Sequence, residues 1–494
     1  MRTLPTIALG LAISGLAAAA QQGSSPSGAS GLDYEYFKAR VQPIFLAKRE
    51  GHARCIACHT SGTPLRLQPL AAGSATWSEE QTRKNFEAVQ RVAVGSARSR
   101  LLLHPLAQQA GGDFYHSGGK HWTSQNDAEW QTLKGWVTGQ TGSTPPAHPT
   151  GSATASAERP ATADRSTTRS ATASAERSAP KPRIIQTNSA GDNVHIIDPA
   201  TNTVVGVISG IEAGHGAGAA PDGSRIYVSD ESTSSLAVVD AKSLTVTKRI
   251  PLSGHPNNMA VGRDGRRVYV GIIQDPGGVD VIDTARLERV KTIPTKGTIH
   301  NAYVTPDGKY VVAGSIQGKT INVIDAATEQ PAWTVEMDLG IRPMTFSWNA
   351  DGSTKWIFAQ LSGFNGFAVV DFATQKEIRR IKNPDLPPGK ATVPEGSDPS
   401  HGMAVTADGK TLVVCSRLNN YLYAYSLPDL NPLGGAELGG KGAGWVTLTP
   451  DGKSAYVANP VTNDVSVVDV RSMKEVARIP VGYVPKRNVT VMLP

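Results

Sequence analysis

Two cysteines and a histidine lie close together near the N-terminal end of the sequence, in the string Cys55-Ile56-Ala57-Cys58-His59. This spacing is typical of c-type haem attachment, in which both thiols add to the vinyl groups of one haem and the adjacent histidine binds the iron. The string occurs once, so the sequence predicts a single covalent haem c held by Cys55, Cys58 and His59. A disulfide between Cys55 and Cys58 is the alternative in an oxidising compartment.

The sixth ligand of such an iron has to be sought among the histidines, because the sequence has no methionine between Met1 and Met259. Methionine ligation raises the haem potential. Its absence therefore predicts either ligation by two histidines at a lower potential or an open position on the iron. The candidates in this part of the chain are His104, His116 and His121.

The residues around these histidines resemble those of the planctomycete-type c cytochromes. The shared features are VQPIF before the haem motif, the segment LLHPL over Leu102–Leu106, an Ala-Gly-Gly-Asp string and a His-x-Gly-Gly string. On that resemblance, His116 is the first choice for the sixth haem ligand and His121 is the next. The resemblance implies an electron-transfer function for this part of the chain.

The segments that would position these side chains have apolar residues at helical spacing. They are residues Tyr34–Ala47, Glu79–Val94 and Asp127–Val137, and loops rich in glycine and histidine separate them. We therefore expect a small all-α cytochrome c domain over residues 33–140.

Two other segments do not have the composition of folded domains. Arg2, a short apolar stretch and a run of alanines predict a secretory signal peptide over residues 1–20. Residues 141–182 consist almost entirely of Ser, Thr, Ala, Pro, Gly and Arg, and such a segment cannot bury enough apolar surface to fold. The sequence thus predicts a periplasmic or secreted protein whose domains are joined by a disordered linker.

After the linker, the sequence repeats with a period typical of a β-propeller. Short runs rich in Val, Ile and Tyr alternate with turns, and most steps between the Asp-Gly turns measure 42 to 44 residues. The turns stand at Asp222, Asp264, Asp307, Asp351, Asp408 and Asp451, and a second marker, an apolar strand end, gives seven units. The first unit, from Arg183, is one strand short, and Asn488–Leu493 supplies a spare strand. We expect an all-β seven-bladed propeller over residues 183–494, closed by its C-terminal strand.

The strings IYVS and AYVAN in these repeats resemble the YVTN family of propellers. Alignment of the blades exposes one position, seven residues before each Asp-Gly turn, where the innermost strand begins. It holds, in order, His215, Asn257, His300, Met344, His401 and Gly444, with Lys486 at the matching place of the closing blade.

Side chains at that position face the central channel at one mouth of the ring. Imidazoles from His215, His300 and His401 could converge there on copper or iron. The alternative is a polar, watery channel in which these histidines only form hydrogen bonds.

The order of domains resembles that of the cytochrome-cd nitrite reductases, in which a c-haem domain precedes a propeller that holds a second haem. On that resemblance, His215, His300 or His401 would be its axial ligand, although those enzymes have eight blades and this chain has seven units. Propellers associated with quinoprotein alcohol oxidation have a similar repeat style, which implies an accessory role without a bound metal.

The composition argues against two classes of protein, those that bind nucleic acids and those that span a membrane. The net charge is +7, but from residue 184 onward 29 basic residues stand against 30 acidic ones, so the basic stripe of a nucleic-acid-binding protein is absent. No internal apolar run approaches the 18 residues of a membrane span. We expect a periplasmic monohaem c-type cytochrome that works in electron transfer, and in its enzymatic form, a haem-dependent oxidoreductase, a small molecule would react at the propeller mouth. The alternative is a propeller that docks a periplasmic electron-transfer protein without catalysis. No catalytic residue can be assigned from the sequence.

Overall fold

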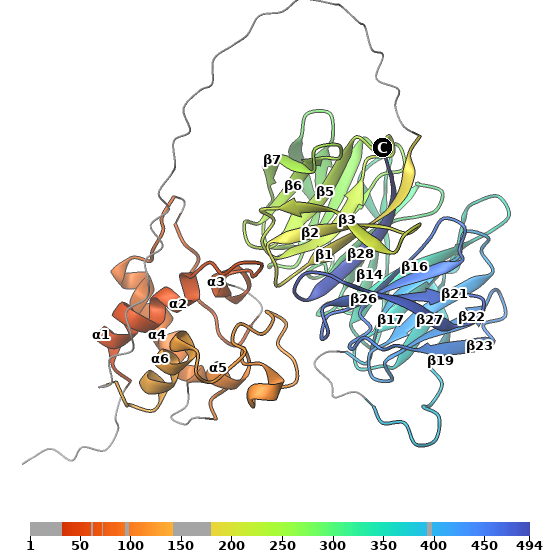
Figure 1. Cartoon of the computed structure of the whole chain (residues 1–494). Coiled ribbons are helices and arrows are strands. Elements are labelled where there is room, and N and C mark those ends of the chain that lie inside the picture. Colours follow the sequence, from red (N-terminus) through yellow and green to blue (C-terminus); the bar gives the residue numbers. More distant parts are fainter. Residues whose placement is uncertain (1–31, 61–62, 72, 94–97, 142–178, 393–397) are drawn as a thin grey trace, which may run out of the picture.

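The computed structural model describes residues 32–60, 63–71, 73–93, 98–141, 179–392 and 398–494. These residues form a helical unit and a ring of β-sheets (Figure 1). The predicted signal peptide and all but the ends of the predicted linker lie outside the described residues. None of the described helices is both long and apolar enough to cross a membrane.

The helical unit is built from short helices around one apolar core. The first three elements follow one another without a break and include one segment of π-helix. The bounds are α1 Tyr34–Tyr36, the π segment Phe37–Val41, α2 Gln42–Leu46, α3 Cys55–His59, α4 Glu79–Val92, α5 Arg100–Leu103, the 3-10 turn Gln108–Ala110 and α6 Ala128–Val137. The three helical segments expected from the periodicity are thus present, whereas α3 and α5 were not predicted.

The helix ends are fixed by side chains that satisfy free backbone N–H groups. Ser78 and Gln81 form a reciprocal capping box at the start of α4, and Asp127 accepts from two backbone N–H groups at the start of α6. Trp136 on α6 is fully buried, and its Nε1 donates to the backbone oxygen of Asp33 at 2.8 Å. The first and last helices of the unit are therefore held together.

The β part is a propeller of seven four-stranded antiparallel sheets, as expected from the repeat. The strands of the first four blades along the chain are β1 Lys181–Asn188, β2 Asn193–Asp198, β3 Thr203–Ser209, β4 Gly214–Ala219, β5 Arg225–Asp230, β6 Ser235–Asp240, β7 Thr245–Pro251, β8 Pro256–Val261, β9 Arg267–Ile272, β10 Gly278–Asp283, β11 Glu288–Ile293, β12 Asn301–Val304, β13 Tyr310–Ser315, β14 Thr320–Asp325 and β15 Gln330–Glu336. The remaining strands are β16 Ile341–Trp348, β17 Thr354–Leu361, β18 Gly366–Asp371, β19 Lys376–Lys382, β20 Ser400–Val405, β21 Thr411–Ser416, β22 Tyr421–Ser426, β23 Pro432–Glu437, β24 Trp445–Leu448, β25 Ser454–Asn459, β26 Asp464–Asp469, β27 Lys474–Pro480 and β28 Pro485–Leu493.

The C-terminal strand closes the ring. β28 pairs with β1 in an antiparallel register that places Ile185 opposite Val489, and it forms the inner strand of the first blade. Figure 1 shows this dark blue strand beside the yellow start of the propeller. The predicted closure is confirmed, and it gives the first blade four strands like the other six. The inner strands around the channel are β28, β4, β8, β12, β16, β20 and β24.

The repeated Asp-Gly pairs make the same tight turn in six blades. At the first of them, Asp222 accepts a hydrogen bond from the backbone N–H of Ser224 at 3.0 Å, and Gly223 has φ +71°. Backbone of that hand strains residues with a Cβ, so glycine is favoured there. The six turns bring the chain from the inner strand back into the second strand of each blade.

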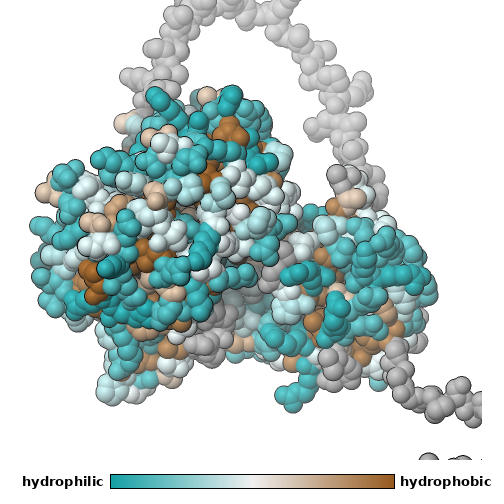
Figure 2. Space-filling view, turned by 180° about the vertical axis from the view of Figure 1, so that it is seen from behind, coloured by the Kyte–Doolittle hydropathy of each residue, from teal (hydrophilic) through white to brown (hydrophobic). Residues whose placement is uncertain are grey.

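The surface of both units is mostly hydrophilic. On the face shown in Figure 2, hydrophobic residues form small, separate groups between hydrophilic ones. Most large apolar side chains with high exposure are on outer strands, such as Val205 on β3 and Val476 on β27. The second and third strands of a blade, such as β5 and β6, are buried over five consecutive residues each.

Candidate functional site

The helical unit encloses a cavity of about 490 Å³, which we call the cysteine–histidine cavity. Apolar side chains such as Phe45, Leu65 and Leu133 form much of its wall. All the residues that the sequence assigned to the covalent haem lie on it, although they are spread over 67 positions from 55 to 121: Cys55, Cys58, His59, His104, His116 and His121. A cavity of this size and lining is typical of a cofactor site.

Two of these imidazoles, those of His59 and His116, lie across the cavity from each other. Their ring centres are 6.1 Å apart and their planes are inclined by 23°. A metal–nitrogen bond of about 2.0 Å on each side, with about 1.1 Å from each nitrogen to its ring centre, would separate the two ring centres by about 6 Å. The observed spacing therefore matches that of two imidazoles bound to one metal ion.

The hydrogen bonds of the same two rings fix which nitrogen is free. Nδ1 of His59 lies 3.1 Å from the backbone oxygen of Leu65, and Nδ1 of His116 lies 2.6 Å from that of Gly119. Because a carbonyl oxygen can only accept, each Nδ1 carries the proton and each Nε2 keeps its lone pair. Histidines that bind metals in proteins are held by the same arrangement.

Both rings are neutral at ordinary pH. Burial lowers the pKa of His116 to about 3 and also lowers the pKa of His59. The cost of placing a charged imidazole in an apolar cavity is the largest cause in both cases. Since only the neutral ring can bind a metal, the cavity keeps both residues in the binding form without a metal present.

A tight turn explains how the His-x-Gly-Gly string positions His116. The backbone N–H of Gly119 donates to the backbone oxygen of His116 at 2.9 Å, and Gly119 has φ +77°. A Cβ at Gly118 would lie 3.0 Å from Cε1 of His116. The first glycine thus makes room for the ring, and the second turns its carbonyl oxygen toward Nδ1.

The other two histidines of the cavity are placed differently. His104 uses both ring nitrogens, because Nδ1 lies 2.5 Å from the Asp113 carboxylate and the Arg100 guanidinium donates to Nε2 at 2.9 Å. His121 has a buried Nδ1 without a hydrogen-bond partner, and its ring centre lies 6.4 Å from that of His116. The geometry therefore favours His116 over His104 and His121 as the partner of His59.

The two thiols of the motif are free, and both cysteines are half-buried. Cys55 and Cys58 form no disulfide with each other, which is the alternative that the sequence left open. Burial raises the pKa of Cys58 to about 12 and also raises the pKa of Cys55. Both are therefore protonated and poorly reactive toward oxidants in the folded chain.

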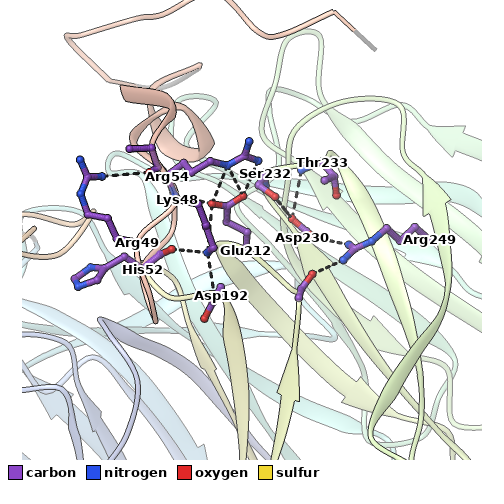
Figure 3. Close-up of polar contacts among 12 residues, drawn as sticks. Lys48, Arg49, His52, Arg54, Asp192, Glu212, Asp230, Ser232, Thr233 and Arg249 are labelled. Atoms are coloured by element: carbon purple, nitrogen blue, oxygen red, sulfur yellow. Dashed lines mark hydrogen bonds and ion pairs between the residues drawn. The ribbon is translucent and has the colours of Figure 1, made fainter. Parts of the chain in front are cut away.

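The helix that carries the haem motif lies directly against the propeller. Arg54 donates from its backbone N–H to the Glu212 carboxylate at 2.6 Å, and its guanidinium contacts both oxygens of that carboxylate (Figure 3). Lys48 lies 3.1 Å from Asp192. The backbone N–H of Ala53 donates to the backbone oxygen of Ala190 at 2.7 Å. Polar contacts thus tie the segment before the motif to the first propeller blade and the loop that leaves it.

An apolar patch completes this contact. The ring of His52 stacks on that of Tyr483 with centres 3.7 Å apart, and Ala57 packs with Ala213 in a small buried cluster that Cys58 also contacts. The propeller therefore covers the part of α3 around Ala57 and Cys58. The sequence contains no signal for this contact, because it predicts only that a flexible linker joins the two units.

We call the second candidate region the propeller mouth, meaning the side chains at the starts of the inner strands. His215 on β4 and His401 on β20 are there as predicted, and His300 stands immediately before β12. All three are buried. The rings of His300 and His401 have centres 6.3 Å apart, whereas His215 is turned to Glu231, with Nδ1 2.9 Å from the carboxylate.

The three histidines do not form one metal-binding group. Nδ1 of His401 donates to the backbone oxygen of Gly444 at 3.0 Å, and Nδ1 of His300 contacts the side-chain amide of Asn301. Within the described ranges, no set of three or more His, Cys, Asp or Glu side chains is arranged to hold a metal ion. The prediction of copper or iron bound by His215, His300 and His401 together gains no support from these positions.

The mouth also holds residues that the sequence reasoning missed. The Arg487 guanidinium lies 3.8 Å from the ring centre of Trp445, and it donates to Asn301 Oδ1 at 2.9 Å. Trp445 in turn packs edge-on against His401 with ring centres 4.6 Å apart. Arg487 and Trp445 each follow the aligned position by one residue, so a comparison of the next position in every blade would have found them.

Comparisons with known proteins address the propeller. Residues 184–314, about a quarter of the chain, match the family described as Cytochrome D1 heme domain, which relates this part of the propeller to haem-binding domains. A structure titled Pseudomonas aeruginosa periplasmic gluconolactonase is 20% identical, covers 63% of this chain and 99% of its own, and has a TM-score of 0.52. No protein among those with curated functions matches.

Two further solved structures match at TM-scores below 0.5. Kuenenia stuttgartiensis hydrazine synthase is 23% identical over 58% of this chain and 92% of its own, with a TM-score of 0.49. Dihydro-heme d1 dehydrogenase NirN is 16% identical over 60% of this chain and 63% of its own, with a TM-score of 0.46. At such identities, structural similarity shows the propeller fold and leaves function to be argued from the site.

Proposed function

We propose that this chain is a periplasmic c-type cytochrome in which the helical unit carries one covalent haem and exchanges electrons through a docked propeller. Cys55 and Cys58 would hold the haem, and His59 and His116 would bind its iron. The observation that carries the proposal is the facing pair of neutral imidazoles, each with Nδ1 fixed by a carbonyl oxygen and Nε2 free. Haem would supply the capacity to accept and release single electrons.

The residues around the cavity have separate parts in this function. The carbonyl oxygens of Leu65 and Gly119 orient the two imidazoles and hold their protons at Nδ1. The apolar wall excludes water, and a low dielectric around the metal is one of the means by which a protein sets a redox potential. Two histidine ligands in place of histidine and methionine favour a low potential.

The contact between the units supports electron transfer toward the propeller. The motif helix is pressed against Ala213 and tied to Glu212, so the haem edge nearest the thiols would face the propeller mouth. Reaction of a small molecule at that mouth is the enzymatic form of the proposal. In the alternative form, the propeller docks a periplasmic electron-transfer protein and the haem acts only as a shuttle.

The match to the Cytochrome D1 heme domain family favours one further candidate, a second haem in the propeller. His300 and His401 would be nearest to such a group, because they stand side by side at the channel. The number of haems per chain distinguishes this candidate from the first proposal. The first proposal requires one covalent haem, whereas this candidate requires two haems, of which one is released by denaturation.

The test is to express the full chain in a host that matures c-type cytochromes and to measure its intact mass under denaturing conditions. We expect the added mass of one haem on the wild type and none on a chain with Cys55→Ser and Cys58→Ser. Cys415→Ser, which changes the buried thiol of β21, is the matched control and should keep the haem. A colourless wild-type protein without added mass would refute the haem proposal, whereas extractable haem beyond the covalent one would support the second candidate.

A further inference from the structure

The propeller mouth carries more positive than negative charge. Its cationic side chains are Arg342, Arg417, Lys486 and Arg487, and the carboxylates that face them are Glu231 and Asp398. The histidines add no charge near neutral pH, because burial and the nearby cations lower the pKa of His300 and of His401. Among the described residues, four cationic side chains thus face two carboxylates, and such surroundings favour an anion.

Two donors in this group have no hydrogen-bond partner. Nε1 of Trp445 and Nε of Arg487 are both buried and have no hydrogen-bond partner. The two residues are only 5% and 7% exposed. Buried polar groups in folded proteins are normally paired, and each exception calls for a partner that the protein alone does not provide. An acceptor supplied by a ligand would satisfy both donors.

The hydrogen bonds also fix the protons of the two histidines. Asn301 accepts from Arg487 through Oδ1, so its amide N–H₂ group faces Nδ1 of His300, which must then accept. The proton of His300 is therefore on Nε2, where it can be donated. His401 has the opposite form, because Nδ1 donates to Gly444 and leaves a lone pair on Nε2.

These side chains form a closed ring of contacts across four inner strands. His300 contacts His401, His401 contacts Trp445, Trp445 lies under Arg487, and Arg487 returns through Asn301 to His300. The ring offers donors on Trp445, Arg487 and His300 and one acceptor on His401. A guanidinium presents paired N–H groups that match the two oxygens of a carboxylate.

We propose that the propeller mouth binds a small hydroxycarboxylate. Its carboxylate would be held by Arg487, Trp445 and His300, and its hydroxyl would donate to Nε2 of His401. The ligand would lie close to the haem motif, because Glu231 and Lys486 of the mouth both act on the pKa of the Cys58 thiol. Binding at this site does not require the haem, so it can be tested independently of the proposed electron transfer.

The first experiment is isothermal titration of the full chain with lactate, propionate and sulfate up to about 10 mM. We expect lactate to bind more tightly than propionate and sulfate to bind weakly. Both Arg487→Lys, which keeps the charge but loses the planar fork, and Trp445→Phe, which keeps the ring but loses the N–H group, should weaken lactate binding at least about tenfold. His401→Phe should leave propionate binding in place and abolish the preference for lactate.

Arg380→Gln on β19 is the matched control, because this arginine pairs with Glu377 and Asp338 away from the mouth. It should bind lactate as the wild type does. Ligand-induced increase of the melting temperature gives a second readout that also shows whether each variant is folded. The proposal is overturned if the wild type binds no carboxylate, if sulfate binds as well as lactate, or if folded Trp445→Phe binds as well as Arg380→Gln.

Discussion

The cysteine–histidine cavity and the propeller mouth both bury several histidines, but they place opposite surroundings around them. In the cavity, His59 and His116 lie among many apolar side chains, and each has Nδ1 held by a carbonyl oxygen. In the mouth, His300 and His401 lie among arginines and use their hydrogen bonds on neighbouring groups. On our proposals, the same residue type would provide the ligands of a flat, apolar cofactor in one place and part of an anion site in the other.

The difference shows that the number of histidines in a site does not predict whether the site can bind a metal. Two imidazoles serve a metal when each is neutral, is held through Nδ1 and has its lone pair aimed at a common point. The mouth has as many histidines, yet one is paired with Glu231 and the others have protons on different nitrogens. The two sites therefore differ in the charge around their imidazoles and in the tautomers of these rings, and neighbouring residues determine both.

The largest expected effect comes from replacing one histidine by alanine in each site, which tests whether the two sites differ in this way. His116→Ala should convert the haem from a low-spin to a high-spin optical spectrum, because it removes one of the two strong ligands of the iron. His401→Ala at the mouth should leave that spectrum unchanged. His104→Ala, in the same cavity, is a second control because both its ring nitrogens are already engaged. A low-spin spectrum in folded His116→Ala would show that another residue, with His121 the first to examine, binds the iron.

The next effect concerns the pH dependence of stability in the mouth. Burial lowers the pKa of His215 from 6.5 to about 4, so the unfolded chain binds a proton that the folded chain rejects between these values. The free energy of unfolding should therefore fall as the pH falls from about 6.5 to 4, by up to about 3 kcal/mol from this residue. The pKa of Glu231 is lowered to about 2, so its contribution is lost only between pH 4.5 and 2.

Denaturant unfolding of the full chain at several pH values checks this sign. His215→Gln should flatten the curve between pH 6.5 and 4. Glu231→Gln should flatten the part below pH 4.5. A wild-type chain that becomes more stable as the pH falls through 6 would contradict the assignment of His215 as a buried neutral ring.

A smaller effect should follow from the turn that positions His116. Gly119→Ala places a Cβ on a residue with φ +77° and brings it 3.2 Å from Cβ of Ala190. We expect a loss of about 1–2 kcal/mol in the free energy of unfolding, together with a changed haem spectrum. Gly139→Ala is the control, because its φ is +71° and its Cβ would meet nothing within 4 Å. It should lose about 1 kcal/mol and keep the spectrum.

Sequence reasoning reached the propeller and most of the helical unit because both depend on local patterns. The Asp-Gly turns repeat at a fixed period, and helices such as α4 show their apolar face and their cap in the sequence. It also reached His116, through a string whose second glycine is needed for the turn. It did not reach Arg487 and Trp445, because they stand one residue beyond the position that was aligned, and it did not reach the Arg54–Glu212 pair, whose partners are in different units.

The prediction of a metal in the propeller shows again that sequence reasoning did not reach the contacts between side chains. Alignment of the blades correctly placed His215, His300 and His401 at the starts of inner strands. It could not show that the ring spreads these positions around a channel, or that Glu231 takes one of the rings. The tautomers of His300 and His401 depend on Asn301 and Gly444, whose part in the mouth has no signal in the repeat.

The smallest expected effect tests whether the two regions are coupled through their contact. Arg54 and Glu212 are partly shielded, with side chains 34% and 13% exposed, and they share three hydrogen bonds of 2.8 to 3.2 Å between their side chains. A double-mutant cycle with Arg54→Ala and Glu212→Ala should give a coupling energy of about 1–2 kcal/mol in the unfolding of the full chain.

The same cycle applied to Lys38 and Glu79, which pair within the helical unit and are about half exposed, is the control and should give less than about 1 kcal/mol. Because the Arg54–Glu212 pair joins the haem motif to the first propeller blade, its loss should also change the haem reduction potential in the same variants. A coupling energy near zero for Arg54 and Glu212, with an unchanged potential, would mean that the cavity and the mouth act as independent sites on one chain.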